Sequence, residues 1–221
     1  SFGKKFNDFN LIKKYTIPNS HQAFVGFFEH SINHYEIAYE IFTNRGPLAV
    51  LPSPNKREKF STFIYSTKDK LSNDVIFNLI KEKFASTHGD IKPVKTVNCF
   101  PISPHLSKDK SNNFFLIGDT LRSIHPVAGQ GWNLGIKDIQ TLSSLLDKNN
   151  LDDENLVKKY SQMRLLESLG YLSFTTFINY LYENQNPMSN LIINSTFNSL
   201  KNFRFLRDTF IKQAMGRTKL I

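Results

Sequence analysis

Residues 114–146 constrain the fold of this chain more tightly than any other stretch. They open with FFLI, a short and wholly apolar run that is typical of a buried strand. Gly118 and Asp119 end the run, and after an irregular loop the triplet GQG at residues 129–131 precedes a helical pattern. The apolar residues beyond the triplet recur at three- and four-residue spacing, so one helix face should consist of Ile136, Ile139, Leu142, Leu145 and Leu146. The stretch therefore predicts a strand, a carboxylate, a glycine-rich turn and a helix.

This order of elements suits an anionic ligand that also carries hydroxyl groups. A helix start leaves backbone N–H groups unpaired and bears a partial positive charge. Gly129 and Gly131 lack a Cβ atom, which lets a ligand approach the backbone, and Pro126 fixes the chain direction before the turn. Asp119, at the end of the predicted strand, is placed to accept hydrogen bonds from ligand hydroxyls. For a bare GxG the simpler alternative is a plain turn between a strand and a helix.

The whole pattern resembles the second FAD motif of class A flavoprotein monooxygenases. It is GD-x9-GQG-x-N-x-G-x-x-D with His125-Pro126 before the glycines, and its wording IHPVAGQGWNLGIKD is most similar to the ubiquinone-biosynthesis hydroxylases. GPLA-x-LP at residues 46–52 is also typical of these hydroxylases. The family commonly has GDAAH, whereas this chain has Arg122 at the last position. The resemblance implies that the cofactor-binding residues are Gly118, Asp119, Pro126, Gly129, Gln130, Gly131 and Asn133, with Asp119 on the flavin ribityl chain.

The resemblance also implies the chemistry. It points to FAD as cofactor, NAD(P)H as reductant, and O2 and a prenylated aromatic compound as substrates of ring hydroxylation in ubiquinone biosynthesis. The cofactor carries the difficult step in such enzymes, and the sequence shows no catalytic triad, P-loop or metal-ligand cluster. No catalytic residue and no metal site are therefore predicted. The alternatives are another class A monooxygenase or epoxidase, and a non-catalytic helical or lipid-binding protein that keeps the motif.

The predicted fold class is α+β, as part of an α/β FAD-binding fold. Residues 1–110 should form a substrate domain with an antiparallel or mixed sheet and one helix, residues 111–150 the C-terminal piece of the FAD-binding domain, and residues 151–221 a helical tail. Strands are expected at residues 21–30, 48–52, 59–66 and, on a sheet edge, 94–102, with a further short element at 38–42. A helix is expected at 69–86, with Gly89 as its stop. The family's GxGxxG unit does not occur in these 221 residues, so the chain resembles a C-terminal fragment that is inactive alone.

Composition limits the partners and the location. The net charge is +9, but the basic residues are dispersed and form no block interleaved with aromatics, so no nucleic-acid partner is expected. No apolar run approaches the ~18 residues of a spanning helix. We expect a cytoplasmic protein with a peripheral contact at the inner membrane face or with other quinone-pathway proteins. The single cysteine, Cys99, fits a reducing compartment and is predicted to be an inert core residue.

Four apolar residues of the predicted sheet are expected to share a face: Phe24, Phe27, Val50 and Phe100. That face is either plain core or the wall of a substrate pocket. Aromatic residues are also dense in the helical tail, where they serve either as core or as a docking surface.

Overall fold

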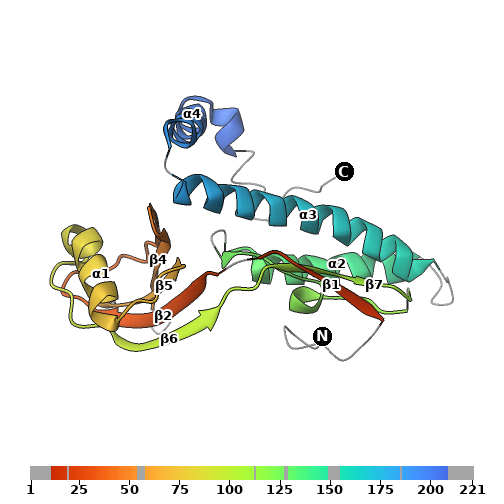
Figure 1. Ribbon diagram of the computed structural model, residues 1–221, viewed down its shortest axis with the longest axis horizontal. Helices are drawn as coiled ribbons and strands as arrows, with labels where there is room; N and C mark the ends of the chain where they lie inside the picture. Colours follow the sequence, from red (N-terminus) through yellow and green to blue (C-terminus); the bar gives the residue numbers. More distant parts are fainter. Residues whose placement is uncertain are drawn as a thin grey trace. The chain divides into compact units, whose positions relative to one another are not determined.

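The computed structural model describes residues 11–18, 20–53, 58–111, 113–126, 129–148, 155–184 and 186–208. Contacts divide the chain into two compact units: Asn19–Ile102 is one, and Ser1–Pro18 joins Ser103–Ile221 in the other. Helices occur together with antiparallel sheets, which confirms the predicted α+β class (Figure 1). The three domains predicted from the sequence were defined by function and not by contacts, so they stay a prediction. The start of the predicted helical tail and everything after residue 208 lie outside the described residues.

The unit Asn19–Ile102 is built on a five-stranded antiparallel sheet of order β3-β4-β5-β2-β6. Its strands are β2 (Gln22–Glu29), β3 (Tyr39–Thr43), β4 (Gly46–Pro52), β5 (Phe60–Thr67) and β6 (Lys95–Pro101). Four of them were predicted as strands, and β3 lies where the sequence indicated only a short element. Strand β6 lies on a sheet edge, as its proline suggested. Gly46 allows the tight turn between β3 and β4, because its φ is +135° and a Cβ there would lie 1.9 Å from the Ser66 carbonyl oxygen.

Helix α1 (Asn73–His88) covers one face of this sheet and closes the core (Figure 1). Ser72 precedes it as the N-cap residue, and Gly89 ends it with a φ of +72°, which confirms the predicted stop. The core combines alternate residues of the central strands with one helix stripe: Phe24, Phe28, Leu48, Val50, Phe63, Tyr65, Ile76, Ile80 and Phe84.

The expectation that Phe24, Phe27, Val50 and Phe100 share a face was wrong. Side chains alternate along a strand, so Phe24 and Val50 pack under α1, while Phe27 and Phe100 belong to the opposite face. Phe100 is 55% exposed. The opposite face also carries Val25, Ala49, Leu51 and Ile64, as the strand register requires.

The prediction that Cys99 is a core residue was also wrong. Its side chain is exposed, and its Sγ atom lies 2.8 Å from the Gln22 Oε1 atom. Cys99 pairs with Phe24 in the sheet register, but it belongs to the edge strand β6, which among the described residues pairs only with β2. Position within the sheet therefore outweighs the apolar character of the surrounding sequence.

The second unit contains a small antiparallel sheet of order β1-β7-β8 and the longest helices. The strands are β1 (Ile12–Thr16), β7 (His105–Asp109) and β8 (Arg122–Ser123), followed by α2 (Gly131–Lys148), α3 (Leu156–Glu183) and α4 (Pro187–Asn202). A 3-10 turn, η2 (Gly118–Thr120), lies before β8. These elements enclose a separate core that consists of Leu106, Leu116, Leu121, Ile124, Leu134 and Leu172.

Residues 114–117, predicted as a buried strand, form no strand because no described segment pairs with them. The backbone is nevertheless extended at Ile117, with φ −130° and ψ 142°, and Leu116 is buried. Tyr160 of α3 donates its hydroxyl hydrogen to the Leu116 carbonyl oxygen over 2.9 Å. The Tyr160 hydroxyl thus provides the Leu116 carbonyl group with a hydrogen bond that a neighbouring strand would otherwise provide.

Helix α2 begins where the sequence predicted, but its predicted apolar face is only partly covered. Ile136 and Ile139 are 40% and 58% exposed, whereas Leu134 and Asp138 are buried. The buried side of α2 therefore carries the Asp138 carboxylate, because two buried arginines, described below, bind it.

Candidate functional site

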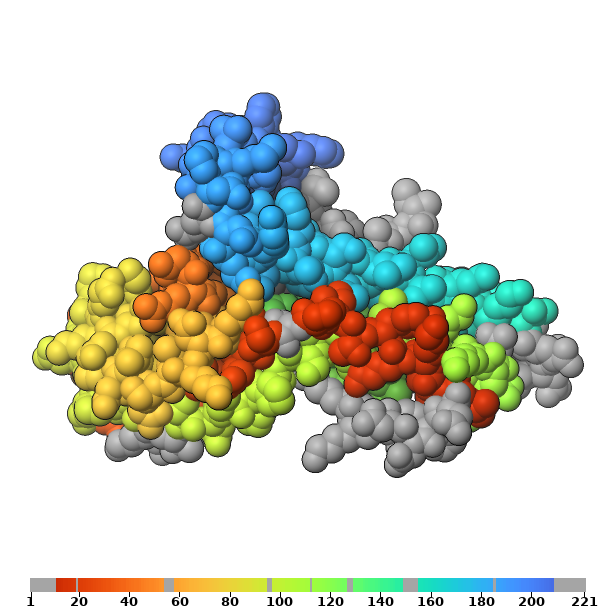
Figure 2. Space-filling view, in the orientation of Figure 1, coloured from red at the N-terminus to blue at the C-terminus, as the bar shows by residue number. Residues whose placement is uncertain are grey.

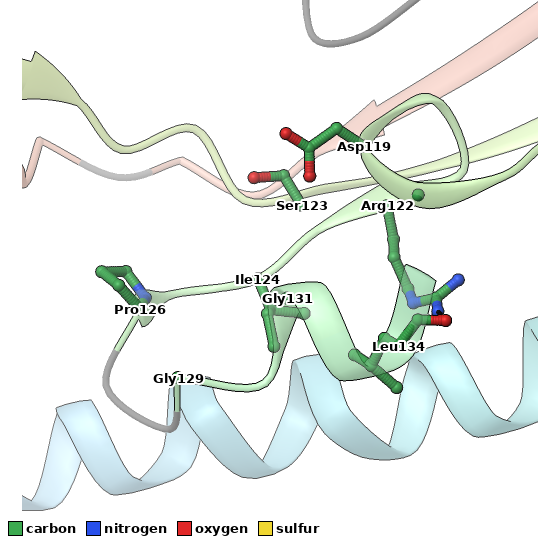
Figure 3. Close-up of a pocket in the computed structure, with 9 residues that line it drawn as sticks. Asp119, Arg122, Ser123, Ile124, Pro126, Gly129, Gly131 and Leu134 are labelled. Atoms are coloured by element: carbon green, nitrogen blue, oxygen red, sulfur yellow. Dashed lines mark hydrogen bonds between the residues drawn. The ribbon is translucent and has the colours of Figure 1, made fainter. Parts of the chain in front are cut away.

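A cleft of about 250 Å³ lies where η2, β8 and the start of α2 meet (Figure 3). Its wall consists of Gly118, Asp119, Arg122, Ser123, Ile124, Pro126, Gly129, Gly131 and Leu134. Five of the seven residues predicted from the motif are among them. Pockets that bury a whole drug-sized ligand measure roughly 300–1,000 Å³, so this cleft can enclose only part of a dinucleotide.

The glycines leave the wall of the cleft open to a ligand. Gly118 and Gly129 have φ values of +59° and +58°, a conformation that residues with a Cβ rarely adopt. Gly131 has no such backbone requirement, and a Cβ on it would meet no atom within 4 Å. Neither strain nor packing therefore explains a glycine at position 131, and the close approach of a ligand there stays a prediction.

Asp119 presents an exposed side chain at this cleft, next to Ser123 (Figure 3). Its backbone is held from β7, because the His105 Nε2 atom lies 3.0 Å from the Asp119 carbonyl oxygen. The other ring nitrogen of His105 lies 3.1 Å from the Ser103 carbonyl oxygen, and burial lowers the pKa of His105. A neutral ring with a single N–H donates to one of the two carbonyls, which fixes the turn without adding charge beside the carboxylate.

Helix α2 points its first turn toward the cleft. Leu134 donates its N–H to the Gln130 carbonyl oxygen over 3.0 Å, and the N–H groups of the preceding helical residues have no partner within the helix. Gln130 and Asn133 bond to each other, with 3.1 Å between the Asn133 Nδ2 and Gln130 Oε1 atoms, and they line a neighbouring cleft that Tyr171 also borders. That all seven predicted residues contact one ligand stays a prediction.

Behind the cleft lies a buried charge cluster that the sequence did not predict: Arg122, Asp138 and Arg164 are each at most 3% exposed. The Asp138 Oδ1 atom accepts from the Arg122 Nη2 atom over 2.9 Å and from the Arg164 Nε atom over 2.7 Å. Its Oδ2 atom accepts from the Gly118 N–H over 2.8 Å. One carboxylate therefore ties the GD turn, β8 and α3 to α2.

Two further contacts extend this cluster. Arg164 pairs with Glu167 one turn along α3, and the Lys137 Nζ atom lies 2.5 Å from the Glu167 Oε1 atom. Arg122 also donates from Nη2 to the Leu134 carbonyl oxygen over 2.9 Å. The only sequence signal for the cluster was Asp138, which is the final aspartate of the motif, because Arg164 lies in a helix of ordinary composition.

The chain is similar to several known proteins. The profile of a family described as an FAD binding domain matches residues 20–171. The ubiquinone hydroxylase UbiL of Rhodospirillum rubrum is 27% identical over 93% of this chain and 50% of its own length. The ubiquinone hydroxylase UbiM of Neisseria meningitidis is 25% identical over 89% of this chain and 45% of its own length. The chain thus spans about half the length of these curated relatives.

Solved structures show the same fold. The p-nitrophenol 4-monooxygenase PnpA from Pseudomonas putida has a TM-score of 0.68 at 15% identity, and the similarity covers 95% of this chain and 57% of PnpA. The Diels-Alderase PyrE3 of pyrroindomycin biosynthesis has a TM-score of 0.67 at 12% identity, over 94% of this chain and 46% of PyrE3. Because proteins with such different names share the fold, the fold does not identify the reaction.

Proposed function

Because the chain belongs to the FAD binding domain family, we propose that it forms the flavin-facing part of an FAD-dependent monooxygenase that hydroxylates a prenylated aromatic ring in ubiquinone biosynthesis. The observation that carries the proposal is the cleft at the GD turn, where five residues of the motif surround one open space. The names of the two ubiquinone hydroxylases support the pathway.

The residues of the cleft fit part of a bound FAD. The exposed carboxylate of Asp119 would accept hydrogen bonds from the ribityl hydroxyls, and the open backbone at Gly129 and Gly131 would lie against the ring and the pyrophosphate. The start of α2 favours negative charge there. When bound, FAD supplies the redox and oxygen chemistry, with NAD(P)H and O2 as co-substrates. The chain's own residues bind and orient the cofactor.

The open face of the five-stranded sheet is the proposed wall of the substrate site. It lies opposite α1 and carries Val25, Phe27, Ala49, Leu51, Ile64 and Phe100. The rings of Phe27 and Phe60 lie 5.2 Å apart on this face, and Leu51 is 37% exposed. A half-exposed apolar and aromatic surface suits an aromatic ring with a prenyl tail.

We also infer a peripheral contact with a membrane surface, because α3 and α4 expose many apolar side chains in a chain of net charge +9. Figure 2 shows atoms of these two helices (cyan to blue) at the surface. The most exposed are Leu166, Met188, Leu191, Tyr180, Phe197 and Met163. Among the described residues, no helix has the length and apolarity needed to cross a bilayer. The alternative partner is another protein of the quinone pathway.

The activity can be tested on the natural full-length protein that contains this chain. We expect it to purify with a flavin absorption spectrum, and to oxidise NAD(P)H faster when a prenylated phenol is present. Labelled O2 should place one labelled oxygen atom on the ring. A flavin-containing protein whose product gains no oxygen would favour another reaction on the same fold, and a colourless protein would favour a non-catalytic role.

A further inference from the structure

We propose that the buried pair Arg122 and Asp138 sets the reduction potential of the bound flavin by holding an incompletely neutralised positive charge behind the cleft. This inference rests on the proposed function, because it assumes that a flavin occupies the cleft. It gives a role to Arg122, which stands where the resembled motif commonly has histidine.

The charges of the cluster do not cancel. Arg122, Arg164 and Lys137 are cationic, whereas Asp138 and Glu167 are the only anionic partners that the structure gives these groups among the described residues. One positive charge is therefore in excess within the cluster. Arg122, Asp138 and Arg164 are buried, so water screens their charges less than it screens the partly exposed Lys137 or the exposed Asp119 carboxylate at the cleft.

We assign the excess charge mainly to Arg122, because Arg164 also pairs with Glu167, whereas Asp138 is the only ion-pair partner of Arg122 among the described residues. Asp138 divides its two oxygens among Arg122, Arg164 and the Gly118 N–H, so it neutralises Arg122 only in part. The buried Nε and Nη1 atoms of Arg122 have no hydrogen-bond partner among the described residues. Arg122 nevertheless forms part of the cleft wall, and Figure 3 shows its side chain running from β8 toward Leu134, away from Asp119. Because those nitrogens are shielded, the guanidinium acts on a ligand through its field.

A positive field at the cleft has a defined effect on a flavin. Reduction makes the ring system more negative, so a nearby cation binds the reduced form more tightly than the oxidised form and raises the potential. By thermodynamic linkage, the ratio of the affinities for reduced and oxidised flavin determines the shift in reduction potential. Removing the cation should lower the potential, and removing the anion that offsets it should raise the potential.

Two variants therefore give opposite predictions. In the flavin-loaded full-length protein, Arg122→Gln should lower the potential of the flavin, and Asp138→Asn, which keeps an acceptor oxygen for its donors, should raise it. We expect each change to alter the ratio of affinities about tenfold, or about 30 mV for a two-electron couple. The potential is measured by equilibrating the protein with a redox dye and recording both spectra.

Arg204→Gln serves as the control, because its side chain is 86% exposed and its charge is screened by water. Arg122→Lys keeps the charge but not the planar fork, so it should leave the potential near the wild-type value while lowering thermal stability. If Arg122→Gln does not fold, the contrast between Asp138→Asn and Arg122→Lys decides the question. Shifts of the same sign in the two charge-removing variants, or no shift in Asp138→Asn, would overturn the inference. A wild-type protein that binds no flavin would overturn the proposed function as well.

Discussion

Two carboxylates of one motif, Asp119 and Asp138, lie in opposite environments. Asp119 is exposed at the cleft, whereas Asp138 is fully buried and accepts hydrogen bonds from two arginines and a backbone N–H. The first is free to meet a ligand, and the second holds the turn that presents it. The sequence pattern contains both residues but does not separate these roles, because the difference arises from Arg122 and Arg164, which reach Asp138 from distant positions.

Asp119→Ala in the full-length protein should lower FAD retention and leave the fold intact. A hydrogen bond to a charged group contributes roughly 1.5–3 kcal/mol, which corresponds to a loss of affinity of about tenfold or more. Flavin content after purification and the melting temperature measure the two effects. Asp147→Ala, at an exposed position of α2, is the matched control. Wild-type flavin content in Asp119→Ala would argue against the assignment.

Asp138→Ala should destabilise the protein even when no flavin is present. Removing the carboxylate leaves two buried guanidinium groups without their shared partner, and breaking a buried ion pair costs about 3–5 kcal/mol. Urea unfolding of the 221-residue chain, compared with Asp119→Ala as the control, measures this difference. Equal midpoints for the two variants would show that the charge cluster contributes little to stability.

At the scale of elements, the sequence predicts those strands and helices whose apolar side chains recur periodically. Four of the five strands of the larger sheet and helix α1 were predicted, because their apolar residues alternate or recur at helical spacing and turn residues separate them. The strands β1, β7 and β8 were missed, since IKKYT and HLSKD carry no apolar alternation and β8 has two residues. The prediction of a strand at residues 114–117 was wrong for another reason. A strand requires a neighbouring strand to pair with, and apolar composition does not show whether one is present.

Three histidines under the larger sheet make the stability of that unit depend on pH. The rings of His30 and His88 lie 4.7 Å apart, and those of His30 and His34 lie 6.1 Å apart. The Nε2 atoms of His34 and His88 are buried without a hydrogen-bond partner among the described residues. Burial and the neighbouring histidines lower the pKa of His88 to about 4, and burial also lowers the pKa of His30. His30 and His88 are therefore neutral at neutral pH when the unit is folded.

Because the folded-state pKa lies below the unfolded value of about 6.5, the unfolded chain binds more protons as the pH falls. Stability is complete above about pH 6.5 and declines as the pH falls toward 4. Between about pH 7.5 and pH 5, His88 alone should cost about 2 kcal/mol. Urea unfolding at several pH values measures the slope. His88→Phe should flatten it, and an unchanged slope in that variant would contradict the role of His88.

At the scale of the whole molecule, the net charge and the dense apolar residues of α3 and α4 were foreseeable from the sequence, but which of those residues are exposed was not. Periodicity predicts these helices, yet it cannot tell which stripe is covered, since that depends on which neighbour packs against each face. Leu166 and Leu191 are 74% and 66% exposed. Leucines this exposed on α3 and α4 favour the interpretation that these helices bind an apolar partner.

The full-length protein should sediment with anionic vesicles at low salt and less at high salt. Each Lys or Arg near an anionic surface contributes about 1 kcal/mol, and salt screens this attraction. Replacing Leu166 and Leu191 with serine should reduce sedimentation at both salt concentrations, whereas Val75→Ser on α1 should not. Equal recovery in the supernatant under all conditions would exclude the membrane contact and favour a protein partner.

The central claim is that a flavin is bound at the cleft formed by the GD turn and the start of α2. The most direct test is a crystal structure of the full-length protein with FAD. We predict that the ribityl chain lies against the Asp119 carboxylate and that the flavin ring lies beside residues 126–131. A flavin bound elsewhere, with Asp119 still exposed to water, would contradict the claim.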